Sequence, residues 1–246
     1  MKGKMLLGLT AILMLTGAAV PVKADDVWKF DAQRFVLKEY TGTETDVVVS
    51  DTMDEGVPVK RLGTQLLAGS ETLTSVVVPD SVTILDVGAL SYDNNLSEIT
   101  LSSNLINIGW NAISSNDALT ELTIPASVCI IDSYAVSGCY ALKKIVFEGA
   151  CPLIGSEAFV MLSDDVVIYV PDDQIEEYKK VFEENNKNLN IQPSGKPAVL
   201  YSAEDYLDTE NLTFDAETGS ITGYNGMNTR LTIPESIDGV PVKANW

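Results

Sequence analysis

The sequence of 246 residues contains no histidine, and its 16 Lys and Arg residues are outnumbered by 35 Asp and Glu residues. Histidine is the commonest general base and metal ligand in proteins. Its absence excludes a Ser-His-Asp triad, a Cys-His dyad, His-ligated zinc and c-type haem. The formal net charge of −19 is the opposite of what nucleic acids and anionic membranes attract. We therefore expect no nucleic-acid partner, and the negative charge favours a soluble monomer.

Only the start of the chain carries a long apolar run. Lys2 and Lys4 precede an uncharged segment at 5–20, and Ala24 closes a plausible cleavage site. This order is typical of a secretory signal peptide, and the run is short for a membrane span of about 20 residues. We predict that residues 1–24 are a signal peptide and that the mature chain is secreted, either free or associated with the cell surface. Its means of attachment, if any, stays open.

The middle of the chain repeats every 23 residues. Apolar residues recur at this step in several columns, and so does alanine. The columns include Leu73, Leu96, Leu119 and Leu142; Val76, Ile99, Leu122, Ile145 and Ile168; and Ala89, Ala112, Ala135 and Ala158. A repeated unit of this size cannot bury its own apolar side, so neighbouring units stack into a solenoid.

Each unit has a physical interpretation. In the segment Leu119–Pro125, apolar residues at 122 and 124 have the two-residue period of a short strand. Proline has no N–H for a strand ladder, so Pro125 ends that strand. The segment that follows turns back with Val128, Ile131 and Ala135 facing inward. The small alanine allows neighbouring coils to approach closely.

The pattern L-x-x-I-x-I-P-x-x-V-x-x-I-x-x-x-A-F/V, over roughly residues 56–171, resembles the BspA-type bacterial leucine-rich repeat. Proline stands where better-known leucine-rich repeats carry an asparagine ladder. The resemblance implies an α/β solenoid, a right-handed superhelix with short parallel strands on one face. It also implies a secreted or surface-displayed bacterial protein, adhesion, and binding of host matrix proteins such as fibronectin. It brings no catalytic residues.

The ends of the repeat block depart from the pattern. Asp46–Val49 predicts an irregular first strand, and an insertion follows it. After the last strand, residues 173–186 predict a helix with Asp172 or Asp173 as N-cap and with a Glu176–Lys180 pair. Its apolar face consists of Ile175, Tyr178, Val181 and Phe182. We expect this helix to cap the open end of the solenoid.

Part of the beginning of the chain recurs near its end. Residues 30–32 match 214–216, and residues 56–60 match 239–243. We expect a truncated tandem module that is either poorly ordered or docked on the first module. The expected organisation is a signal peptide at 1–24, an N-terminal cap with the irregular first strand at 25–55, a repeat domain at 56–193, a linker at 194–213, and the start of a second repeat module at 214–246.

The cysteines and the acidic loops offer little chemistry. Cys129, Cys139 and Cys151 are odd in number, and a Cys129–Cys151 bridge between coils is conceivable. Free, buried cysteines are the simpler interpretation, and the redox state stays open. Asp and Asn clusters such as 92–95 are explained by turn chemistry and match no spaced calcium loop. We predict no metal, no cofactor and no catalytic site.

The outward side of the strands is the candidate binding face. The only bases in residues 73–171, Lys143 and Lys144, fall on it, one and two rungs from Glu121 and Glu98. A cross-strand charge ladder would explain these residues equally well. We expect exposed apolar positions to extend the face. The candidate set is Glu98, Thr100, Glu121, Thr123, Lys143, Lys144, Val146 and Tyr169, with Val166 and Val167 as neighbours.

Two functions follow from these observations. The first is non-catalytic binding of an extracellular protein or glycan through a rigid surface. The second is a spacer or scaffold in a longer surface protein whose binding or catalytic part lies elsewhere. A hydrolase built on a carboxylate pair is disfavoured, because nothing in the sequence aligns such a pair in a cleft.

Overall fold

The computed structural model describes residues 27–53, 56–185, 189–199, 212–217, 220–224, 236–237 and 240–241. The predicted signal peptide at 1–24 lies outside these residues, so its presence and removal stay predictions. Within the described part of the chain, no helix combines the length and the apolar character that crossing a bilayer requires.

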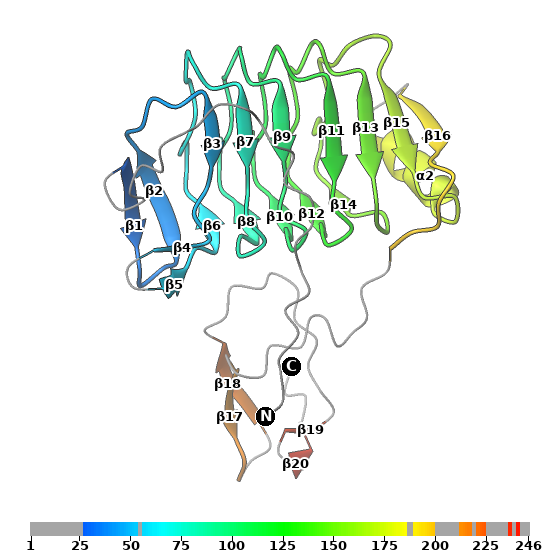
Figure 1. Ribbon diagram of the computed structural model, residues 1–246. Coiled ribbons are helices and arrows are strands. Elements are labelled where there is room, and N and C mark those ends of the chain that lie inside the picture. The colour runs from blue at the N-terminus through cyan, green and yellow to red at the C-terminus, as the bar shows by residue number, and fades with distance from the viewer. Residues whose placement is uncertain are drawn as a thin grey trace, which may run out of the picture.

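The repeats form a solenoid whose longer strands stand side by side along one side (Figure 1). Two parallel sheets make this side, and we call their outward surface the strand face. The first sheet contains β3 (Asp46–Val48), β7 (Ser75–Val77) and β9 (Glu98–Thr100). The second contains β11 (Glu121–Ile124), β13 (Lys144–Phe147), β15 (Val167–Val170) and β16 (Asn190–Pro193). The predicted single sheet is therefore interrupted between β9 and β11.

A further sheet of seven strands, the lateral sheet, forms another side of the solenoid. An antiparallel hairpin of β1 (Trp28–Asp31) and β2 (Val36–Tyr40) begins it. Two-residue parallel strands from successive coils then continue it: β6 (Arg61–Leu62), β8 (Ile84–Leu85), β10 (Asn107–Ile108), β12 (Ile130–Ile131) and β14 (Leu153–Ile154). The sequence predicted strands on one side only. Strands of only two residues are too short to show the alternation of apolar and polar positions, so the sequence pattern does not reveal them.

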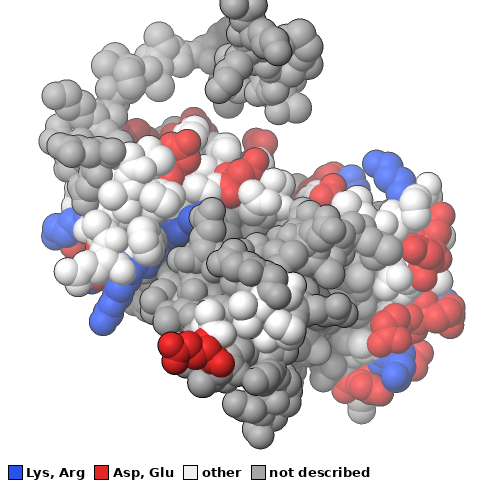
Figure 2. Space-filling model, turned by 90° about the horizontal axis from the view of Figure 1, so that it is seen from below, with Lys and Arg blue, Asp and Glu red and all other residues white. Residues whose placement is uncertain are grey.

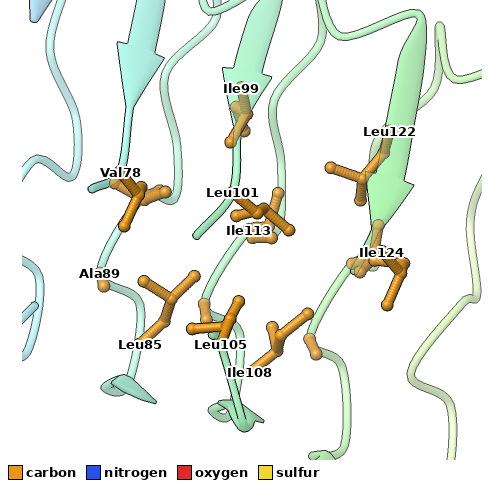
Figure 3. Packing of buried hydrophobic residues seen from close by; sticks show 14 of the residues in the cluster. Val78, Leu85, Ala89, Ile99, Leu101, Leu105, Ile108, Ile113, Leu122 and Ile124 are labelled. Carbon is orange, nitrogen blue, oxygen red and sulfur yellow. The ribbon is translucent and has the colours of Figure 1, made fainter. Parts of the chain in front are cut away.

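Between the two sides lies one continuous apolar interior. The predicted inward columns are buried, including Leu122, Ile131 and Ala135. Figure 3 shows Ile99, Leu101 and Ile124 on the strand side and Leu105 and Ile108 on the returning segment, all within the same interior. Burying a side chain such as Leu contributes about 1.5–3 kcal/mol. The repeated columns therefore supply most of the driving force for stacking.

The alanine column allows the coils to approach closely, as predicted. Backbone N–H groups of Leu90, Ile113 and Val136 each donate to the carbonyl of the alanine in the next coil, at 2.8–2.9 Å. Glycine is needed at another point of coil contact. A Cβ added to Gly109 would lie 2.6 Å from the carbonyl oxygen of Leu85.

The C-terminal helix α2 (Ile175–Asn185) packs against the last coils, and it is the one complete helix that the described residues form. Tyr178 and Phe182 are buried. Their rings contact Phe147 at centroid distances of 4.9 and 6.2 Å, and Phe182 also contacts Phe159. The Tyr178 hydroxyl donates to the carbonyl of Gly149 at 3.2 Å, and burial raises the pKa of this hydroxyl. The predicted apolar face is confirmed, whereas the capping role is inferred below.

The polar contacts of α2 differ from the prediction. Glu176 pairs with Lys179 at 3.1 Å, three residues on, instead of with Lys180. The side chains of Asp172 and Asp173, the predicted N-caps, accept from the backbone N–H of Gly195 and Ala198, each at 2.8 Å. They therefore tie residues 194–199, the start of the predicted linker, to the last coil. A backbone bond of 2.9 Å from Val199 to Glu148 adds to this attachment.

Two small hairpins follow in the C-terminal region. In the first, β17 (Leu212–Asp215) pairs with β18 (Ser220–Tyr224), with an irregularity between Thr213 and Phe214. The pairing repeats that of β1 and β2, including an irregularity between Lys29 and Phe30. In the second, β19 (Ser236–Ile237) pairs with β20 (Val240–Pro241), as β4 (Thr52–Met53) pairs with β5 (Val57–Pro58).

These paired hairpins fall on the predicted second module, which stays a prediction. Residues 225–235 of that module lie outside the described residues.

Candidate binding surface on the strand face

Two rows of side chains run across the strand face. The first row changes in chemistry from coil to coil: Ser75, Glu98, Glu121, Lys144 and Val167. The second row is mainly β-branched: Val48, Val77, Thr100, Thr123, Val146, Tyr169 and Gln192. Parallel strands place successive members of a row about 4.8 Å apart. The fold thus brings most of the predicted candidates together, although Glu98 and Thr100 belong to a different sheet from the rest.

Both lysines of the face have acidic partners. Lys144 Nζ lies 2.9 Å from Glu121 Oε2 in the neighbouring strand, as the predicted charge ladder requires. Lys143 Nζ lies 3.5 Å from Asp165 Oδ2, in the following coil, instead of beside Glu121 or Glu98. All four side chains are largely exposed, and exposed pairs of this kind contribute about 0.2–1 kcal/mol. The charges are therefore available to a partner at little cost in stability.

Asp165 is a member of this surface that the sequence analysis missed. A hydrogen bond from Ser163 and the nearby Lys143 charge hold the pKa of its carboxyl below the ordinary value. The signal was present, because Asp165 lies 22 residues after Lys143, close to the repeat step. At the other end of the face, Asp46 accepts from Ser75 at 2.6 Å, and this bond and one from Thr74 lower the pKa of its carboxyl.

The apolar end of the face is smaller than predicted. Val166 is only 4% exposed and belongs to the core, so its assignment as an outward residue is wrong. It precedes β15, where the chain still turns inward after the preceding loop. Val146, Val167 and Tyr169 are partly exposed. At the opposite end of the second row, Val48 and Val77 add exposed apolar surface that was not predicted.

A polar column lies inside the solenoid, at positions expected to be simple turns. Asp93 and Asn116 are completely buried. The Asn116 amide donates to the carbonyls of Leu90 and Ile113, both at 2.8 Å, and its oxygen accepts from the N–H of Asp93 at 3.0 Å. Cys139 occupies the same position one coil later, and its thiol contacts the Ile113 carbonyl at 3.3 Å. This column joins successive coils through the backbone.

Asp93 is only half satisfied in this column. Its Oδ1 accepts from the N–H of Ser70, while Oδ2 is buried without a partner among the described residues. Burial raises the pKa of the Asp93 carboxyl to about 7, although the backbone N–H groups of Ser70 and Gly69 oppose the shift. The group therefore holds its proton well above the usual pH range of a carboxylic acid.

The described residues offer no group of three or more Cys, Asp or Glu side chains placed to hold a metal ion. None of the three cysteines takes part in a disulfide. Burial raises the pKa of Cys139 to about 11 and that of Cys151 to about 12. Thiolates, not thiols, act as nucleophiles and metal ligands, so these two side chains are chemically unreactive near neutral pH.

Charge is distributed unevenly over the surface. Figure 2 shows many acidic and few basic side chains at the end of the molecule that carries α2. Helix α2 contributes acidic residues in its first turn and has no base in its last turn. The strand face differs from this end, because its two lysines interrupt the acidic surroundings.

The repeat pattern identifies the family. A model of the BspA type leucine rich repeat region matches residues 60–190 in 6 copies, which is more than half of the chain. The chain therefore belongs to the BspA-type leucine-rich repeat family. The two-sided stacking of short coils is the architecture that this repeat predicts.

Solved structures of bacterial leucine-rich repeat proteins are similar to the chain. A leucine-rich repeat protein from Bacteroides capillosus is 33% identical and covers 50% of this chain and 93% of its own, with a TM-score of 0.43. The leucine rich repeat protein of T. pallidum is 20% identical over 68% of this chain and 99% of its own, with a TM-score of 0.44. A leucine rich cell surface protein from Faecalibacterium prausnitzii is 21% identical over 70% of this chain and 39% of its own, with a TM-score of 0.46. Among curated proteins, no relative matches the chain.

Proposed function

We propose that this leucine-rich repeat protein works outside the cell or at its surface and binds an extracellular protein or glycan without catalysis. The observation that carries the proposal is the strand face. Stacked coils hold two rows of side chains on a rigid scaffold, so binding costs little conformational entropy. Solenoids in general use such extended surfaces for recognition.

The two rows of the strand face suggest separate roles. Partly exposed β-branched and aromatic side chains in the second row, such as Val146 and Tyr169, offer apolar contact. Lys144 and Lys143 offer two positive charges in an acidic molecule, and each is held by a carboxylate. Charge patterning of this kind selects partners and orients their approach. A partner with an acidic group beside an apolar strip fits this face.

The test is a charge reversal on the face with a matched control elsewhere. Purified chain is measured by surface plasmon resonance against a panel of matrix proteins, fibronectin among them, and of glycans. We expect at least one binder, and we expect the double variant Lys143→Glu, Lys144→Glu to bind it at least tenfold more weakly. The control Lys179→Glu, Lys180→Glu makes the same charge change on α2 and should bind within twofold of the parent. Equal binding by parent and face variant would reject the strand face as the site.

A second candidate function is that of a spacer or scaffold in a tandem array. The observation that favours it is the β17–β18 hairpin, which repeats the strand pairing of β1–β2 down to the position of its irregularity. A spacer binds nothing on the panel, and the strand-face charges then have no effect on any measured interaction.

Rigidity of the face also requires a closed end, and we assign this role to α2. Its Tyr178 and Phe182 cover Phe147 and Phe159 of the last coils, which would otherwise present aromatic surface to water. Terminal repeats of solenoids need such a cover. The helix thereby supports β15 and β16, which carry the apolar end of the face.

A further inference from the structure

A second exposed surface lies on the turns that follow the short strands of the lateral sheet. Val87, Trp110 and Tyr134 follow β8, β10 and β12 by two or three residues, in three consecutive coils. Their exposed fractions are 42%, 47% and 36%. We call these three side chains, one aliphatic and two aromatic, the aromatic ridge. None of them belongs to the strand face, so the ridge is separate from the surface proposed above.

Contacts between coils fix the ridge. The Trp110 and Tyr134 rings meet edge to face, with their centroids 6.3 Å apart. The backbone N–H of Gly88 donates to the carbonyl of Trp110, and that of Gln65 donates to Val87, both at 2.9 Å. The hydrogen bonds hold the backbone of Val87 and Trp110, and the ring contact fixes Tyr134 relative to Trp110.

Tyr134 lies at a turn position that is left-handed in successive coils. Its φ is 60°, and Gly88, Asn111 and Glu157 hold the same position in neighbouring coils with φ of 62°, 55° and 57°. Glycine and asparagine tolerate this conformation, whereas a bulky side chain is less favoured in it. The turn of the repeat therefore sets this backbone, and the Tyr134 side chain is 36% exposed there.

Hydrogen-bonding groups accompany the rings. A hydrogen bond with Glu157, in the next coil, raises the pKa of the Tyr134 hydroxyl. The hydroxyls of Ser133 and Ser156 lie 3.3 Å apart beside them. Residues 73–171 contain no base other than Lys143 and Lys144, which are paired on the strand face. The ridge thus combines aromatic surface with hydrogen-bond acceptors, and Arg61 at its N-terminal end is paired with Asp86, the residue before Val87.

The size of the ridge limits its occupant. Three coils at about 4.8 Å per coil span roughly 10 Å, comparable with a disaccharide. A stable protein interface needs about 800 Å² on each partner, far more than three side chains supply. A polymer bearing phosphate or uronate groups would face Glu157 without a base to neutralise it.

We propose that the aromatic ridge binds a neutral glycan, with sugar rings packed on Trp110 and Tyr134 and sugar hydroxyls donating to Glu157 and the adjacent serines. An aromatic ring face is complementary to the apolar C–H face of a pyranose. Serine hydroxyls and a carboxylate accept from the hydroxyls at the ring edge.

The experiment is affinity electrophoresis of the full chain through native gels containing β-glucan, mannan or galactan, with polygalacturonate as the anionic comparison. We expect at least one neutral polysaccharide to retard the chain and polygalacturonate not to do so. The variant Trp110→Ala, Tyr134→Ala should weaken retardation at least tenfold. The control Tyr92→Ala, Tyr140→Ala removes two other exposed aromatic side chains and should change it less than twofold.

A second variant separates binding from folding. Tyr134→Gly relieves the left-handed backbone, so its melting temperature should rise while its affinity for the polysaccharide falls. The Lys143→Glu, Lys144→Glu variant should be retarded like the parent, which keeps this test independent of the strand face. Failure of every neutral polysaccharide to retard the chain would overturn the proposal. So would unchanged retardation after loss of Trp110 and Tyr134, or ridge-dependent capture of a protein alone.

Discussion

Residue types are repeated in the interior of the solenoid but vary on its surface, although both follow the same 23-residue step. Inside, a column keeps its chemistry: Ala89, Ala112, Ala135 and Ala158 are all completely buried. On the strand face, one row passes from Glu98 and Glu121 to Lys144 and Val167. Repetition provides stability, because each coil buries its neighbour. Departure from repetition marks where a partner could distinguish this chain from another solenoid.

The largest difference in stability between interior and surface substitutions should appear at the C-terminal end. Phe182→Ala removes a buried ring that contacts Phe147 and Phe159, and loss of a buried Phe costs about 3–5 kcal/mol. The exposed Lys180→Ala on the same helix should change stability by less than about 0.5 kcal/mol. Urea unfolding followed by circular dichroism measures both. A Phe182→Ala chain as stable as the parent would remove α2 from its capping role.

Adjacent residues of one strand test the same contrast in the middle of the solenoid. Leu122 is buried and Thr123 is exposed. Leu122→Ala should lower the free energy of unfolding by about 2–5 kcal/mol, and Thr123→Ala by less than about 0.5 kcal/mol. The same urea titration compares them. Similar losses at the two sites would mean that the strand face is itself part of the packed structure.

Asp93 is a buried polar residue within an interior that is otherwise mainly apolar. Because its pKa is raised to about 7, the folded state holds the proton more tightly than the unfolded state. Its contribution to stability is complete below about pH 4 and is lost as the pH rises through 7. An unsatisfied buried polar group costs about 1–3 kcal/mol. Asp93→Asn should therefore be more stable than the parent by about this amount at pH 8, with the difference shrinking toward pH 4.

Thermal unfolding of parent and Asp93→Asn across pH 4–8 provides that comparison. The exposed Asp117→Asn, in the next coil, makes the same change of side chain outside the interior and serves as the control. Other carboxyls have lowered pKa values, namely Asp31, Glu44, Asp46 and Asp165. These groups lose their contribution to stability as the pH falls, equally in the parent and in Asp93→Asn. A parent more stable than Asp93→Asn at pH 8 would show that the carboxylate is better satisfied than its contacts indicate.

The smallest effect belongs to the surface ion pair. A double-mutant cycle on Lys144 and Glu121, with alanine at each position, should give a coupling of about 0.2–1 kcal/mol that weakens in high salt. A coupling well above this range would make the pair a structural element, and the strand-face charges would no longer be free for a partner.

The sequence could predict the columns because burial repeats. Leu122 and Ile145 recur at a fixed step, and this step predicts the stacking and the strand face. The apolar side of α2 is predicted separately, from the helical spacing of its apolar residues. The lateral sheet could not be predicted, because a strand of two residues such as Ile130–Ile131 is too short to show a period. Val166 is buried although it lies one 23-residue step after the outward Lys143, because the chain is not yet extended before β15.

The candidate site was only partly predictable from sequence. The contact between Lys144 and Glu121 agrees with the cross-strand charge ladder that the sequence allowed, because both residues lie within strands whose register the repeat fixes. Lys143 lies before its strand, so its direction toward Asp165 depends on the preceding loop. The aromatic ridge and the Asp93 column depend on left-handed turns and buried side-chain bonds, which a one-dimensional pattern does not show.

The central claim is that the strand face binds an extracellular partner. Its most direct measurement is the ratio of dissociation constants for the Lys143→Glu, Lys144→Glu chain and the Lys179→Glu, Lys180→Glu chain against the same ligand. We predict a ratio of at least ten, because the two chains carry equal charge and differ only in which surface is reversed. A ratio near one would contradict the claim.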